Sequence, residues 1–123
     1  MMRLNLKDMT VSALMDRFAE IGVAQDEALL ESQVAQFNRL FDLEVAITEE
    51  LKSRDGDQRN SLTELFRHPN MQVRLNAAKA TLAVAPEKAR RLLEEIAASN
   101  YYPQAAEAKG SVRDLDSGFY KPT

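Results

Sequence analysis

The chain has 123 residues, a formal net charge of −3 and a pI of about 5.2. That length suits a single domain, which we place over residues 1–123, with a core large enough to fold without disulfides. The chain contains no cysteine, so thiolate metal sites and thiol nucleophiles are excluded. Basic residues are spread along the chain, which disfavours nucleic acid and anionic membranes as partners.

The N-terminal segment Met1–Asp8 lacks the apolar run of a signal peptide. Nowhere in the sequence is an apolar stretch long enough to span a bilayer. We therefore expect a cytoplasmic protein, by default rather than from a positive signal.

Apolar residues recur at helical spacing through the first half of the chain. Thr10 is a candidate N-cap for a helix that begins at Val11. Gly22 interrupts the pattern, so this region is either one bent helix or two short ones. Ser32 is the next candidate cap, and the apolar residues from Val34 to Leu51 follow one side of a long helix.

A turn is predicted at Asp55-Gly56, with Asp57 able to cap the next helix. The spacing of Leu62, Leu65 and Phe66 predicts that this helix is short and amphipathic. His68-Pro69-Asn70 ends it, because proline has no amide to donate and restricts the residue before it.

Two apolar stripes run through Met71–Ala85, and we predict one helix over this range. A helix that is apolar over most of its girth must be contacted on several sides. It should therefore form the centre of the core, with Leu75 and Leu82 as structural residues.

Pro86 suits the first turn of the next helix. After it we expect a loop, a short helix over Gln104–Lys109, and a C-terminal tail over about 111–123. The tail carries Phe119 and Tyr120, large apolar side chains of which we expect one or the other to pack on the helical body as a terminal cap. Fraying, or binding to a partner, is the alternative.

No sustained alternation of apolar and polar residues predicts a strand. The fold class is therefore all-α, with about five to seven helices.

The segment Leu62–Leu82 resembles a HEAT repeat. The likeness lies in a leucine-rich first helix, the Pro69-Asn70 turn, and a second helix that opens with Val73-Arg74. The resemblance implies a HEAT/armadillo-like α-α superhelix, in which Arg74 would help to tie successive repeats together.

The whole chain also resembles a small bacterial family known as a domain of unknown function. The resemblance implies the same α-α superhelix and no activity. The matching segments are Gln25–Leu29, Phe37–Phe41, Glu50–Arg54, the HEAT-like block and Gly118–Pro122.

Catalytic, cofactor and metal sites are not predicted. His68 could be a general base, but its place beside Pro69 favours a turn residue. Glu49, Glu50 and Asp55 could be paired carboxylates, but consecutive glutamates point in different directions on a helix. A solvated surface is the favoured interpretation, so we expect no enzyme and no cofactor.

Five polar residues are candidates for binding a partner. Asn38 and Arg39 lie in a strongly apolar helix, where either a polar contact in a groove or one buried and one exposed side chain is possible; we favour the latter. The polar side of the alanine-rich helix either lines a concave binding face or is simply solvated, and both remain open. These latter residues are Gln72, Asn76 and Lys79.

The sequence thus favours a non-enzymatic protein-interaction module, such as a bacterial partner protein or a toxin-neutralising protein. The alternative is a regulatory or structural subunit that assembles with itself, so a homo-oligomer is possible. An enzyme with an unidentified substrate is the least favoured.

Overall fold

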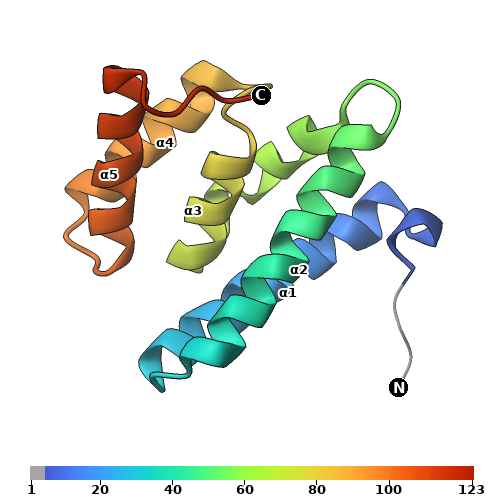
Figure 1. Cartoon of the computed structure of the whole chain (residues 1–123), viewed down its shortest axis with the longest axis horizontal. Coiled ribbons are helices and arrows are strands. Elements are labelled where there is room, and N and C mark those ends of the chain that lie inside the picture. Colours follow the sequence, from blue (N-terminus) through green and yellow to red (C-terminus); the bar gives the residue numbers. More distant parts are fainter. Residues whose placement is uncertain (1–4) are drawn as a thin grey trace. The chain divides into compact units, whose positions relative to one another are not determined.

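The chain is helical throughout the residues that the structure, a computed structural model, describes: 5–123. Residues 1–4, the start of the segment in which a signal peptide was not expected, lie outside that range. Within it there is no strand, which confirms the all-α class (Figure 1). In chain order the elements are η1 (Leu6–Asp8), α1 (Val11–Leu30), α2 (Val34–Ser53), η2 (Gln58–Arg67), α3 (Met71–Ala80), α4 (Pro86–Ala98) and α5 (Gln104–Ser117), where η denotes a 3₁₀ helix.

These helices group into two compact units. The first unit ends at Ser61 and holds α1 and α2. The second unit covers Leu62–Thr123 and holds α3, α4 and α5. The expectation of one domain over residues 1–123 stays a prediction.

In the first unit, α1 packs along α2, and each helix buries one apolar stripe. The hydroxyl of Thr10 caps α1 by accepting a hydrogen bond of 3.0 Å from the amide of Ala13, as its place in the sequence predicts. Gly22 is buried inside α1 and does not break it, so this region is one helix rather than two.

Ser32 does not cap α2, and the expectation that it would is wrong. Its φ of 56° is left-handed. Its amide donates to the carbonyl of Leu29, and the next amide, of Gln33, donates to that of Ala28 at 2.8 Å. This pair of bonds is a Schellman motif, so Ser32 ends α1 instead of starting α2. Gln33 is the N-cap residue of α2 and makes no capping bond with its side chain.

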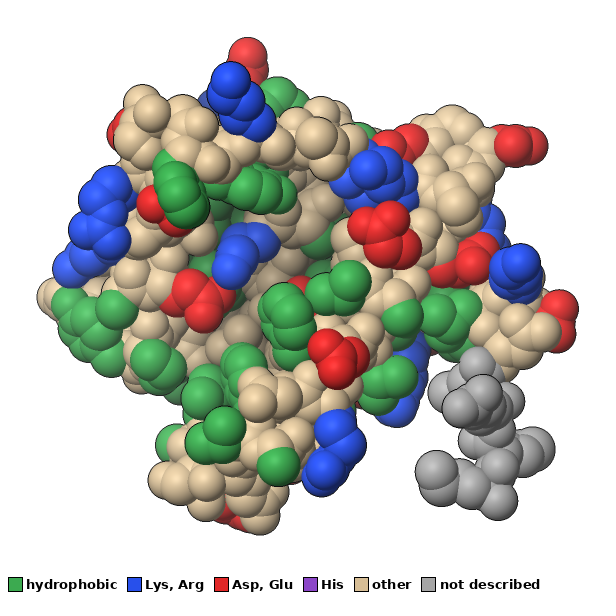
Figure 2. Space-filling model, in the orientation of Figure 1, with side chains coloured by type: hydrophobic (Ala, Val, Ile, Leu, Met, Phe, Trp, Pro, Cys, Tyr) green, Lys and Arg blue, Asp and Glu red, His purple; other side chains and the backbone are tan. Residues whose placement is uncertain are grey.

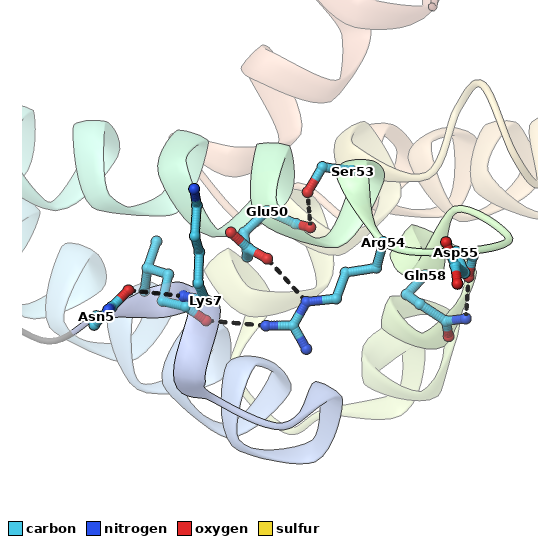
Figure 3. A network of polar contacts seen from close by, with 8 residues as sticks. Asn5, Lys7, Glu50, Ser53, Arg54, Asp55 and Gln58 are labelled. Atoms are coloured by element: carbon cyan, nitrogen blue, oxygen red, sulfur yellow. Dashed lines mark hydrogen bonds and ion pairs between the residues drawn. The ribbon is translucent and has the colours of Figure 1, made fainter.

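Arg54 ties η1 to the end of α2 (Figure 3). Its Nε donates to Oε2 of Glu50 at 2.8 Å, and its Nη2 donates to the carbonyl of Leu6 at 2.9 Å. These charge-assisted bonds fix η1 against the end of α2, although Leu6 and Arg54 are 48 residues apart in sequence.

In the second unit, α3 ends at Ala80, earlier than the predicted end at Ala85. The hydroxyl of Thr81 donates to the carbonyl of Ala77 at 2.8 Å, and its amide donates to that of Ala78. A threonine that bonds back in this way competes with the next helical turn. Pro86 then disfavours a helical conformation for the residue before it.

The core of the second unit lies between α3, α4 and α5. Leu75 on α3 is fully buried, and Leu82 is buried although it lies beyond the end of the helix. Val73 and Ala77, on the second apolar stripe of α3, are also fully buried. The expectation that this helix is covered on several sides is therefore confirmed.

α5 is longer than predicted: it runs to Ser117, where we expected a tail from about residue 111. Ala105 and Ala108 are buried, and Val112 and Leu115 pack on the same core cluster. Their spacing continues one helical stripe through Gly110, which therefore does not end the helix.

The C-terminal segment begins where Gly118, with a φ of 78°, ends α5. The amide of Tyr120 donates to the carbonyl of Asp114 at 3.2 Å, which holds the chain against the last turn. Phe119 leaves 84% of its surface exposed, so the expected cap is wrong for this residue, whereas Tyr120 leaves 49% exposed and is half-buried. Val112 and Leu115 already cover this end of the core.

Candidate protein-binding face

Exposed apolar side chains gather along one side of α2. Val34 is 69% exposed, Phe41 48% and Val45 43%. Steps of seven and four residues place them on the same side of the helix. This side is distinct from the stripe that α2 buries, which consists of Leu40, Ile47 and Leu51.

Asn38 lies on the same side, four residues after Val34 and three before Phe41, and its side chain is exposed. We call Val34, Asn38, Phe41 and Val45 the α2 face. Of the five predicted partner-binding residues, Asn38 is the one that the structure places among exposed apolar side chains.

Arg39 lies elsewhere on α2. It is four residues from Leu43, so these two share another side of the helix. Its Nη2 and Nε donate to Oε1 of Gln36 at 2.7 and 3.2 Å. Both Asn38 and Arg39 are exposed, so the expectation that one of them would be buried is wrong. Both side chains are exposed because none of residues 5–123 packs over these two sides of the first part of α2.

Gln72 and Asn76 do not form a solvated face, because both are buried. Nε2 of Gln104 donates to Oε1 of Gln72 at 3.0 Å, and Nε2 of Gln72 donates to Oδ1 of Asn76 at 2.9 Å. This amide chain joins α3 to α5 inside the second unit. Polar side chains in an alanine-rich helix were here a sign of buried hydrogen bonding rather than of a binding surface.

Lys79 is exposed at the end of α3, and its Nζ lies 3.0 Å from Oε2 of Glu107 on α5. Arg74 donates from Nε to the carbonyl of His68 and so ties α3 to the turn that precedes it. Lys79 and Arg74 therefore make contacts within the second unit.

His68 is held as a turn residue, since its Nδ1 accepts a hydrogen bond of 3.0 Å from the amide of Asn70. Glu50 is paired with Arg54, whereas Glu49 and Asp55 are exposed. Across residues 5–123, no three histidine or acidic side chains come together in a way that could hold a metal ion.

A shallow groove of about 770 Å³ runs between α4 and α5. Its floor is apolar, with Ala97, Ala98 and Val112, and its rim carries charges of both signs, including Glu94 and Lys109. Such a surface offers contact area of mixed polarity.

Charges on the surface are mixed in sign. Figure 2 shows acidic and basic side chains interspersed over the face in view. A hydrogen bond from Arg59 lowers the pKa of Asp57, and one from Arg90 lowers the pKa of Asp116. In both pairs the neighbouring arginine stabilises the ionised carboxylate and balances its charge.

In the part of the chain that the structure describes, no helix has the length and apolar character needed to cross a membrane.

Comparisons with known proteins identify a family and a similar solved structure. No curated protein matches the chain. The crystal structure of the protein RPA1889 from Rhodopseudomonas palustris CGA009 matches with a TM-score of 0.95 and 53% sequence identity, over 98% of this chain and 100% of that one. The model of the family described as "Domain of unknown function (DUF2019)" matches residues 12–116. The chain therefore belongs to this family of domains of unknown function.

Proposed function

We propose that the protein is a non-enzymatic interaction module that binds another protein through the α2 face. The observation that carries the proposal is the row of exposed apolar side chains, with Phe41 at its centre. Single exposed apolar residues are ordinary, but a contiguous group at helical spacing is typical of a protein–protein contact. Asn38 within it supplies a polar group that can fix the register of a bound helix.

The partner is proposed to be a protein, such as a bacterial toxin or another bacterial protein, in the cytoplasm. The mixed surface charge supports a protein over nucleic acid, which would require a basic surface. A regulatory or structural subunit that assembles with itself is the second candidate, since an exposed apolar face serves a second copy equally well.

We further propose that the helices form a HEAT/armadillo-like arrangement. The support comes from the second unit, where α3 packs against α4 and α4 against α5, so that consecutive helices are neighbours. Helical solenoids are built from such nearest-neighbour packing.

The test is an affinity pull-down from the native host with three baits: the wild type, Phe41→Ser/Val45→Ser and Leu43→Ser. Leu43 is a matched control, because it is 45% exposed on the same helix but on another side. We expect a partner that is retained by the wild type and by Leu43→Ser and lost by the double variant. Equal recovery with all three baits would disprove a role for the α2 face.

A further inference from the structure

We infer that the occupant of the α2 face is the α2 face of a second copy of the chain, packed antiparallel about a two-fold axis level with position 43. The inference rests on the proposed function, because it names the partner of the same face. It gives the self-assembling alternative a defined geometry.

The pattern of α2 is that of a helix which packs on two others. Its buried stripe already contacts α1. The α2 face then continues, in alternating steps of four and three residues, from Val45 to Thr48 and Lys52. Alternation of three and four is the spacing of a seam between two paired helices. Thr48 and Lys52 are partly exposed, so the seam reaches the end of the helix.

Charge selects the antiparallel direction. With Phe41 opposite Val45, Lys52 of one copy lies opposite Val34 of the other and close to Glu31, which is exposed just before α2. A parallel pair in register would instead oppose Lys52 with Lys52. Antiparallel helices also place their opposite dipole ends together.

Asn38 fixes the register. In the antiparallel arrangement, its amide lies opposite the hydroxyl of Thr48 in the other copy. A shift by one helical turn in one direction would place the amide opposite Val45, where a buried polar group without a hydrogen bond is destabilising. A shift in the other direction would place it opposite Lys52 and bring that charged side chain into the seam. One polar residue in an otherwise apolar seam commonly has this effect.

Pairing two copies in this way combines two α1–α2 hairpins into a four-helix bundle with two-fold symmetry. Such bundles pack their helices along seams of this spacing. The contact is isologous, so it closes on itself and does not propagate into a filament.

The first experiment is sedimentation equilibrium of the full chain up to about 1 mM, a concentration at which even a millimolar dissociation constant is detected. We expect a monomer–dimer equilibrium, an increase of at least tenfold in the dissociation constant for Phe41→Ser/Val45→Ser, and no change for Leu43→Ser. Circular dichroism of the variants at low concentration checks that each is folded.

The second experiment uses engineered cysteines, which is unambiguous because the chain has none of its own. Asn38→Cys and Thr48→Cys are made singly and then mixed under mild oxidation. We expect a disulfide-linked dimer in the mixture at a yield well above that of either variant oxidised separately. Efficient cross-linking of Asn38→Cys with itself would overturn the antiparallel geometry.

The outcomes separate the two proposals. A wild type that stays monomeric up to about 1 mM overturns the second-copy inference. If the double variant then still loses a protein in the pull-down, the α2 face binds a different partner and the proposed function stands. If the double variant retains every protein in the pull-down and has the same dissociation constant as the wild type in sedimentation, both proposals fail.

Discussion

Nη1 of Arg90 on α4 lies 2.7 Å from Oδ1 of Asp116 in the last turn of α5. Arg90 also lies 3.7 Å from Glu94, one turn further along its own helix. The hydrogen bond between Arg90 and Asp116 raises the pKa of the guanidinium and lowers that of the carboxyl. The pair thereby links α4 to a helical turn that the sequence pattern alone assigned to a tail.

The first prediction concerns this pair. In Arg90→Gln, the pKa of Asp116 should rise toward the ordinary value of about 3.9, because the group that stabilises its charged form is gone. Titration of the Asp116 carboxyl carbon by NMR measures this. Arg91→Gln, one residue along α4, is the control and should leave the Asp116 titration as it is; an unmoved curve in Arg90→Gln would mean that the pair does not form in solution.

The second prediction is a pH dependence of stability from Asp57. Its pKa is lowered in the folded chain, chiefly by the hydrogen bond from Arg59. A lowered folded-state pKa contributes stability above the unfolded pKa of about 3.9, and this contribution is lost as the pH falls through the folded value. Asp57→Asn should therefore be destabilised at pH 7 and should lose less stability than the wild type below pH ~4.

Asparagine is the suitable substitution at this position. Asp57 has a left-handed φ of 52°, which asparagine tolerates better than most residues. The measurement is chemical denaturation at several pH values. If the free energy of unfolding falls by the same amount in the wild type and in Asp57→Asn as the pH is lowered, the Asp57–Arg59 pair does not contribute to stability.

Much of the fold can be predicted from local sequence signals. The hydroxyl of Thr10 caps α1, as expected of a short polar residue directly before a run of apolar residues at helical spacing. Asn70, which the sequence pattern assigned only to the end of the preceding helix, caps α3 in the same way. Pro86 opens α4 as its missing amide allows. These positions could be predicted because the physical cause lies within three residues of its effect.

Signals that serve two purposes could not be resolved in the same way. Ser32 is as suitable for starting a helix as for ending one, and the bond from Gln33 to Ala28 decides in favour of ending α1. Thr81 is a small β-branched residue that fits a helix, yet its own hydroxyl bond competes with the next turn. In each case the residue type alone does not reveal the hydrogen bond that determines where the helix ends.

The third prediction is that Leu75→Ala destabilises the protein by about 2–5 kcal/mol, because it removes a fully buried side chain from a packed core. Leu30→Ala is the control: Leu30 is 81% exposed, so its change should lie within about 0.5 kcal/mol. Urea denaturation gives both values, and similar midpoints for the two variants would contradict the position of α3 in the core.

The fourth prediction concerns the buried amide chain. Gln72→Leu removes the link that joins Gln104 to Asn76, and should cost about 1–3 kcal/mol of stability. The double variant Gln72→Leu/Gln104→Leu should cost less than the sum of the two single changes, because contacting residues couple by about 0.5–3 kcal/mol. Strict additivity in denaturation would show that the two amides do not interact.

The candidate site was predictable only in part, for the same reason as this amide chain. Sequence pattern identifies Gln72, Asn76 and Asn38 alike as polar residues in apolar helices. Whether such a residue is buried depends on what packs over it, as α5 supplies Gln104 to Gln72. The exposed apolar neighbours of Asn38 form a second stripe on α2. The sequence shows these residues, but they were expected to lie on the same side of the helix as the buried ones.

The last prediction concerns the C-terminal segment. Phe119 is 84% exposed, so Phe119→Ala should change the free energy of unfolding by no more than about 0.5 kcal/mol. Leu115→Ala, four residues earlier, removes a side chain that packs on the core cluster of the second unit and should destabilise more. Both variants truncate a large side chain to alanine, one in the last turn of α5 and one just beyond the helix. They therefore separate a residue that covers the core from one that only follows it. Thermal unfolding at a fixed low protein concentration compares them without a contribution from association. A loss of stability in Phe119→Ala equal to that in Leu115→Ala would show that the aromatic ring caps the helical body in solution.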